Sequence, residues 1–273
     1  MNRSLRFAFV SLLFLLAATS FARSNQSVDV ALVLAVDVSR SMSPEELLLQ
    51  RKGYAAAISS PEVVRAIELG AHGRIALTIF EWANVGHKRE IAGWAIIETQ
   101  QDADVFATRI LETESFGQRR TSISGAIRHA SRLFQKLPFK AERHVIDISG
   151  DGPNNQGGDV TRARDAALGD GLIINGLPLM TRSGFGQQFN IEDLDEYYRR
   201  CVIGGPGSFM IPVNDWAQFP EAVRRKLILE IGGFVPHQSA RVMHAQLTFQ
   251  QPYDCQVGEK IWQRLREQYF LDP

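Results

Sequence analysis

Residues 28–41 read VDVALVLAVDVSRS, an almost unbroken apolar run that ends in short oxygen-bearing side chains. A strand that is covered by helices on both faces needs such a continuous run, whereas a half-exposed strand alternates apolar and polar residues. The residues SPEE at 43–46 then combine an N-cap serine, a proline and a glutamate in the order that is typical of a helix start. A buried strand followed at once by a helix predicts an α/β fold.

The same alternation of apolar runs and helical segments continues to residue 233. Because only a short polar turn separates residues 74–82 from 91–97, we expect these two strands to pair antiparallel. The prediction is a doubly wound domain over residues 28–233, with a mostly parallel central sheet, one antiparallel edge strand and helices on both faces. The expected strands are 28–38, 74–82, 91–97, 143–149, 172–179 and 208–213, and the expected helices are 43–59, 102–112, 121–134, 160–168, 191–201 and 216–231.

The two ends of the chain depart from this pattern. Residues 1–22 carry Arg3 and Arg6, then an apolar run, then small residues up to Ala22, as in a cleaved secretory signal peptide. The alternative is a membrane anchor, but the run is shorter than the roughly 20 residues that span a bilayer, and no later stretch is apolar enough. The prediction is a periplasmic or secreted bacterial protein. Residues 234–273 are expected to form a C-terminal extension that can include a short helix at 258–268.

Composition narrows the choice of partners. The formal net charge is zero, and removing residues 1–22 takes away two arginines and no carboxylates, so nothing indicates a nucleic-acid partner. The sequence does not indicate an oligomeric state. Cys201 and Cys255 have neither CxxC nor Cys/His spacing, so in an oxidising compartment a disulfide is favoured over a metal or catalytic pair. Two separate buried thiols are the alternative.

Short oxygen-bearing side chains follow the strands at the edge where open parallel sheets bind ligands. Asp37, Ser39 and Ser41 come after the first strand, Asp151 comes after the strand at 143–149, and Thr121 opens a helix. Mg²⁺ prefers octahedral oxygen coordination and keeps several waters, so a few carboxylates and hydroxyls suit it. The pattern predicts a divalent-cation site made of these residues.

The DxSxS segment that begins at Asp37, together with the distant Thr121 and Asp151, resembles the metal-ion-dependent adhesion site of von Willebrand factor A domains. The resemblance implies that Ser39, Ser41 and Thr121 bind the ion directly, and that Asp37 and Asp151 bind it directly or through water. It further implies Mg²⁺, with Mn²⁺ or Ca²⁺ as alternatives, and a protein partner whose Asp or Glu carboxylate completes the coordination.

Over residues 29–233 the chain resembles, more narrowly, a bacterial family of exported proteins of this kind without an assigned function, the DUF1194 type. Where the usual domain has Thr-Asp-Gly or Ser-Asp-Gly, Gly150 intervenes between Ser149 and Asp151, and this bears on how far Asp151 reaches. The segments that carry the resemblance are VDVALVLAVDVS, HGRIALTIFEW, RTSISGAI, VIDISGDGPNN, INGLPL, YYRRCVIGGPGSF and RRKLILEI.

The leading functional hypothesis is a cation-dependent binding module that is not an enzyme, because no GxSxG elbow, general base or second metal cluster accompanies the site. The alternative is a phosphatase-like metal-dependent hydrolase with Asp37 as nucleophile. Against it, Ser39 stands where such enzymes want a second acid, and no lysine lies nearby. A third hypothesis is an exported small-ligand binding protein without a metal.

Neighbouring residues allow further expectations. Asp147, on the strand that leads to Asp151, is expected to be a buried structural group rather than a ligand. Arg119 and Arg120 would favour a carboxylate-bearing ligand, with solvated loop arginines as an equal alternative. Asn154 and Asn155 are expected to shape a recognition surface.

Overall fold

The computed structural model describes residues 27–181, 190–233 and 253–270. The predicted signal peptide and most of the segment between residue 233 and the short C-terminal helix lie outside these ranges. Within them, no helix combines the length and the apolar character that a membrane crossing requires.

The centre of the fold is a five-stranded sheet in the order β4-β3-β2-β6-β7. The strands β2, β3, β6 and β7 are parallel, and β4 pairs antiparallel with β3 at the edge, as the sequence predicts. Every residue of β2 and β3 is buried, which explains their continuous apolar runs. Their bounds are β2 (Ala31–Asp37), β3 (Ile75–Trp82), β4 (Lys88–Ile97), β6 (His144–Gly150) and β7 (Ile173–Pro178).

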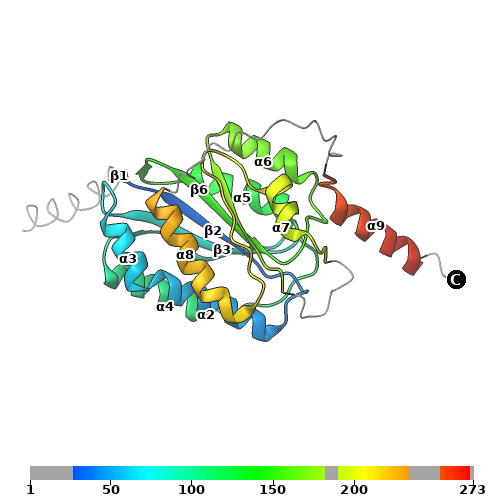
Figure 1. Ribbon diagram of the computed structural model, residues 1–273, viewed down its shortest axis with the longest axis horizontal. Coiled ribbons are helices and arrows are strands. Elements are labelled where there is room, and N and C mark those ends of the chain that lie inside the picture. Colours follow the sequence, from blue (N-terminus) through cyan, green and yellow to red (C-terminus); the bar gives the residue numbers. More distant parts are fainter. Residues whose placement is uncertain (1–26, 182–189, 234–252, 271–273) are drawn as a thin grey trace, which may run out of the picture.

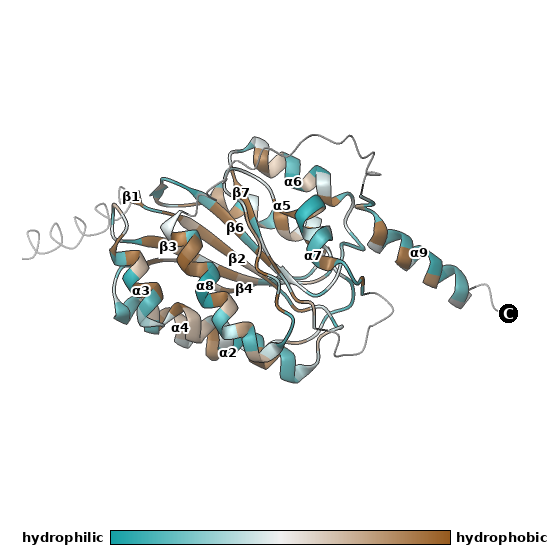
Figure 2. Ribbon diagram, viewed as in Figure 1, coloured by the Kyte–Doolittle hydropathy of each residue, from teal (hydrophilic) through white to brown (hydrophobic). Residues whose placement is uncertain are grey.

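Helices cover both faces of this sheet, so the doubly wound prediction is confirmed (Figure 1). One apolar cluster joins the sheet to α2 (Pro44–Ile58), α3 (Pro61–Glu68), α4 (Gln100–Leu111) and α8 (Phe219–Gly232). A second cluster joins the other face to α5 (Ile123–Phe134), α6 (Val160–Gly169), α7 (Leu194–Tyr197) and the π-helix η3 (Tyr198–Val202). Figure 2 shows the hydrophobic strands enclosed between the two helical layers.

The predicted first strand is divided. Its start forms β1 (Ser27–Val28), which pairs with β5 (Lys140–Ala141) in a separate two-stranded sheet. Asp29 marks the division, because its carboxylate accepts backbone hydrogen bonds from His72 at 2.9 Å and Arg74 at 3.3 Å.

One helix is missing from the prediction, and two expected elements need correction. The helix α3 was not predicted, although Ser60 caps it as Ser43 caps α2. Residues 208–213 form no strand and only single bridges at Met210 and Val213, because Pro212 between them has no N–H for a ladder. The expected helix at 191–201 begins only at Leu194 and widens into the π-helix η3; this wider turn accompanies burial of both Tyr198 and Cys201.

A buried ionic group fixes α8 on the sheet. The Lys226 ammonium lies 2.8 Å from the Asp147 carboxylate and also pairs with Glu230, and all three side chains are shielded from solvent. The Glu230 carboxylate in addition accepts a hydrogen bond from Asn175 at 2.9 Å. Asp147 is therefore the structural group that its strand position predicts.

Replacing Lys226 by methionine should lower the free energy of unfolding by about 3–5 kcal/mol, because Asp147 and Glu230 would lose their buried counter-charge. Urea denaturation measures this change. Arg225→Met is the matched control, since Arg225 is exposed on the same helix, and it should stay within about 0.5 kcal/mol of the wild type. A loss that is equally small for Lys226→Met would mean that this ionic group does not hold α8.

Candidate metal centre

The centre is built at the carboxyl ends of β2 and β6, which lie side by side. Their parallel register places Val36 opposite Ser149, so Asp37 and Asp151 leave the sheet together. The turn after β2 is tight because the Ser39 amide donates to Asp37 Oδ1 at 2.7 Å. Directly after this turn, the Ser43 and Glu46 side chains cap the start of α2 in the predicted manner.

Four of the predicted side chains form one hydrogen-bonded cluster. The Ser39 hydroxyl lies 3.0 Å from Asp37 Oδ2 and 3.0 Å from the Ser41 hydroxyl. Both serines also reach Asp151 Oδ1, at 3.2 Å from Ser39 and 2.8 Å from Ser41. The cluster therefore joins carboxylate and hydroxyl oxygens from two strand ends within the buried edge of the sheet.

Thr121 is held beside this cluster through its backbone. Its amide donates to Asn155 Oδ1 at 2.9 Å, and its carbonyl accepts from the Asn155 amide at 2.8 Å. On the other side, Gln118 pairs with the turn after β2, since its amide donates to Val38 and its carbonyl accepts from Arg40. Across the described ranges, no hydrogen bond joins the Thr121 hydroxyl to the four clustered side chains. The structure thus brings the loop of Thr121 to the site without a hydrogen bond from the Thr121 hydroxyl to the cluster.

Gly150 explains the departure from the usual motif. A Cβ atom at this position would lie 3.0 Å from Asp37 Oδ2 and 2.9 Å from the Tyr198 hydroxyl, both tighter than ordinary contact. Glycine therefore leaves room for the Asp37 carboxylate while β6 continues through residue 150. Asp151, one residue later, still contacts both serine hydroxyls.

Burial raises the pKa of both carboxylates of the cluster. Burial raises the pKa of Asp37 well above its usual range, and the nearby charge of Asp151 raises it further. Burial likewise raises the pKa of Asp151 to about 6, against the hydrogen bonds that it accepts from Ser41 and Ser39. No lysine or arginine of the described chain forms an ion pair with either carboxylate. The positive charge of a bound cation would offset the electrostatic cost of burying these two carboxylates in their charged forms.

The donor set suits a hard divalent cation. Asp37, Asp151, Ser39 and Ser41 offer oxygen ligands alone, and Mg²⁺ prefers a few such ligands with water in the remaining positions. A zinc-type cluster of three or more His, Cys, Asp or Glu side chains is absent from the described part of the chain. The residues present therefore fit Mg²⁺ or a similar ion.

A cavity of about 470 Å³ opens beside Asp151. Polar side chains of Thr181, Asn190, Glu192 and Asn214 line it together with Leu179. The candidate metal centre therefore borders a space that a ligand side chain can enter.

One expectation about the neighbouring residues is wrong. Asn154 is fully buried and cannot shape a surface; its amide oxygen instead accepts from the Ser124 backbone at 2.9 Å. The Arg120 guanidinium lies 3.2 Å above the ring of Trp262 and stays partly exposed, and Arg119 is exposed, so the preference of these arginines for a carboxylate-bearing ligand stays a prediction. The pairing of Asn155 with Thr121 was missed, and its only sequence signal is the turn-forming run GPNN.

The predicted disulfide between Cys201 and Cys255 is present. It joins η3 to the chain just before the helix α9 (Val257–Phe270), which the sequence places at 258–268. Residues from 253 onward are thereby attached to the domain.

A doubly wound sheet with a DxSxS turn after β2 and an aspartate after β6 defines a von Willebrand factor A-like fold. A model of the family described as "Protein of unknown function (DUF1194)" matches residues 27–235. The chain belongs to this family. No curated protein matches the sequence.

Solved structures support the fold assignment. A von Willebrand factor type A protein from Catenulispora acidiphila superposes with a TM-score of 0.52 at 13% identity, covering 76% of this chain and 43% of that one. The pilus adhesin SpaC from Lactobacillus rhamnosus GG gives 0.56 at 10% identity, covering 76% and 31%. Proximal thread matrix protein 1 from the mussel byssus, with a zinc-occupied MIDAS motif, gives 0.51 at 13%, covering 76% and 47%. This chain spans less than half the length of each, and at such identities the likeness establishes the fold alone.

Gly150→Ala should destabilise the protein by about 1–3 kcal/mol, because the added methyl group would crowd Asp37 and Tyr198. Chemical denaturation measures the difference. Gly152→Ala serves as the control, since a methyl group there meets no atom within 4 Å. Equal stability of the two variants would show that residue 150 has no need of glycine.

Proposed function

We propose that this protein is an exported, divalent-cation-dependent binding module without catalytic activity, in which Asp37, Ser39, Ser41, Thr121 and Asp151 hold Mg²⁺. The observation that carries the proposal is the sharing of Asp151 Oδ1 by the Ser39 and Ser41 hydroxyls, with the buried Asp37 carboxylate in the same cluster. Mn²⁺ and Ca²⁺ are the alternative ions, because they accept the same oxygen ligands.

The serine hydroxyls have partners in the site without a cation and can also bind a cation directly. In the structure Ser41 donates to Asp151, and each hydroxyl oxygen keeps lone pairs that a cation can use. The Ser39 amide holds the Asp37 carboxylate in place, and the Asn155 side chain holds the backbone of Thr121. These bonds fix the ligands before a cation arrives, which lowers the cost of ordering them on binding.

We further propose that the partner is a protein that supplies an Asp or Glu carboxylate. A bound cation would supply the positive charge that attracts this group, and the cavity beside Asp151 has room for the side chain next to it. Two of the similar structures are a pilus adhesin and a protein with a zinc-occupied MIDAS motif, which agrees with this class of function.

The proposed domain organisation follows the same reasoning. Residues 1–22 are a signal peptide, residues 28–233 are the von Willebrand factor A-like domain, and residues 234–273 are an extension. A periplasmic or secreted location agrees with the disulfide, since such bonds persist in oxidising compartments.

A phosphatase-like activity is less well supported. A catalytic lysine beside Asp37 would be needed, but the buried Lys226 is committed to Asp147 and Glu230. Ser39 also occupies the place of the second acid, and its hydroxyl bonds to Asp37. A binding module needs neither of these groups.

The test is isothermal titration of the mature, chelator-treated protein with Mg²⁺ and with Mn²⁺. We expect saturable binding at one site, and its loss in Asp37→Ala and Asp151→Ala, because each variant removes a carboxylate from the cluster. Asp104→Ala is the control, since Asp104 is an exposed carboxylate on α4. Circular dichroism checks that the variants keep the fold. Unchanged affinity in either site variant would overturn the assignment.

A further inference from the structure

The C-terminal helix α9 packs directly on the loop that carries Asp151. Glu259 Oε1 accepts a hydrogen bond from Asn154 Nδ2 at 2.6 Å. At Gly258 a Cβ atom would collide with the Asn154 carbonyl, so the backbones of α9 and this loop touch. The second Glu259 oxygen is buried without a hydrogen-bond partner in the described chain. Burial raises the pKa of Glu259, and the hydrogen bond from Asn154 opposes this shift.

Asn154 transmits this contact to the rest of the site. The Asn154 side-chain oxygen accepts a hydrogen bond from the Ser124 backbone amide at the start of α5. The backbone amide of Asn154 donates to the Tyr197 hydroxyl at 3.1 Å. It stands three residues after Asp151 and directly before Asn155, which binds the backbone of Thr121. Asn154 therefore lies in the one loop that carries Asp151 and binds the backbone of Thr121.

A second contact joins α9 to the loop that carries Thr121. Arg120, directly before Thr121, has a φ of 78°, and it is the only described residue other than glycine with a positive φ. L side chains avoid this conformation unless the surroundings impose it. The Trp262 ring, on the same helix α9, lies 3.2 Å from the Arg120 guanidinium, a cation–π contact that holds the arginine in place.

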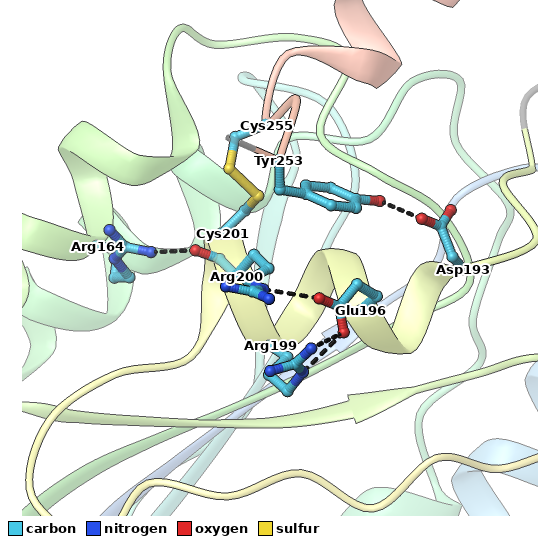
Figure 3. Close-up of polar contacts among 8 residues, drawn as sticks. All are labelled: Arg164, Asp193, Glu196, Arg199, Arg200, Cys201, Tyr253 and Cys255. Carbon is cyan, nitrogen blue, oxygen red and sulfur yellow. Dashed lines mark hydrogen bonds and ion pairs between the residues drawn. A yellow bond between two sulfur atoms is a disulfide. The ribbon is translucent and has the colours of Figure 1, made fainter. Parts of the chain in front are cut away.

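The start of α9 is itself tethered. The disulfide joins Cys255 to Cys201, and the Tyr253 hydroxyl donates to Asp193 at 2.9 Å (Figure 3). Figure 1 shows α9 leaving the body of the domain beyond this point, so its docking depends on the first turns. Residues 253–262 thus form one strut, attached covalently to η3 and non-covalently to the two loops of the site.

We propose that this strut positions Thr121 and Asp151 for the cation, with Glu259 and Trp262 as positioning residues. The inference rests on the proposed function of the site. It extends that function, because residues outside the domain would contribute to the affinity of the site for the cation. Residues that hydrogen-bond directly to metal ligands contribute about 10–100-fold to metal affinity, and we expect Glu259 and Trp262 to act in the same way through Asn154 and Arg120. We expect losses of that size when the strut is released.

The test compares Mn²⁺ titrations of the full mature protein carrying matched substitutions. Glu259→Ala and Trp262→Ala should weaken Mn²⁺ binding about 10–100-fold, whereas Glu259→Gln, which keeps an acceptor for Asn154, and Trp262→Phe, which keeps a ring for Arg120, should restore most of it. Gln263→Ala, on the exposed side of α9, should bind as the wild type does. A stabilising role alone would lower the melting temperature without this pattern of rescue.

Hydrogen exchange of the metal-free protein separates the two proposals. The amides of Ser124 and Asn155 should exchange faster in Glu259→Ala and Trp262→Ala than in the wild type, because the loops that bury them would be released. If the wild type binds no cation, the proposed function fails, yet faster exchange still shows that the strut positions the loops. If the wild type binds Mn²⁺ and both alanine variants bind it equally well with unchanged exchange, the strut proposal is wrong.

Discussion

The candidate site depends on two carboxylates that are buried close together at one edge of the sheet. Asp37 ends β2 and Asp151 directly follows β6, and the parallel register of these neighbouring strands places the two residues close together. Burial disfavours the charged forms of both, and the charge of Asp151 further disfavours that of Asp37. The serine hydroxyls that bridge them and the glycine at 150 that makes room for them are arranged around this pair.

The same sheet contains a second group of buried carboxylates, and the comparison is informative. Asp147 and Glu230 are as deeply buried as Asp37 and Asp151, but Lys226 neutralises part of their charge within the fold. Buried charges are ordinarily paired or coordinate a metal. In the described chain the pair at the strand ends has hydroxyl and amide donors and no cationic side chain. A lysine therefore balances the structural carboxylates Asp147 and Glu230, whereas the place of such a counter-charge beside Asp37 and Asp151 is open to a cation.

Much of this could be predicted from the sequence because the signals are local. Asp37, Ser39 and Ser41 lie within one turn, and continuous apolar runs mark the buried strands on which the site is built. Asn154 reads as a surface loop residue because nothing near it in the sequence announces Glu259, more than a hundred positions later. Arg120 has the same difficulty, since Trp262 covers it only after the chain has folded. The helix α3, by contrast, has a local signal that could have predicted it, because Ser60 and Pro61 repeat the serine and proline that start α2.

The C-terminal extension changes how the domain is to be understood. The family match ends at residue 235, and all five candidate ligands lie before that point. Yet the loops that carry Thr121 and Asp151 are held by side chains of α9, which begins at Val257. A disulfide adds a covalent link to this attachment directly before α9 begins. The domain contains the donor atoms, whereas the precision with which two of its loops are placed depends on a segment outside it.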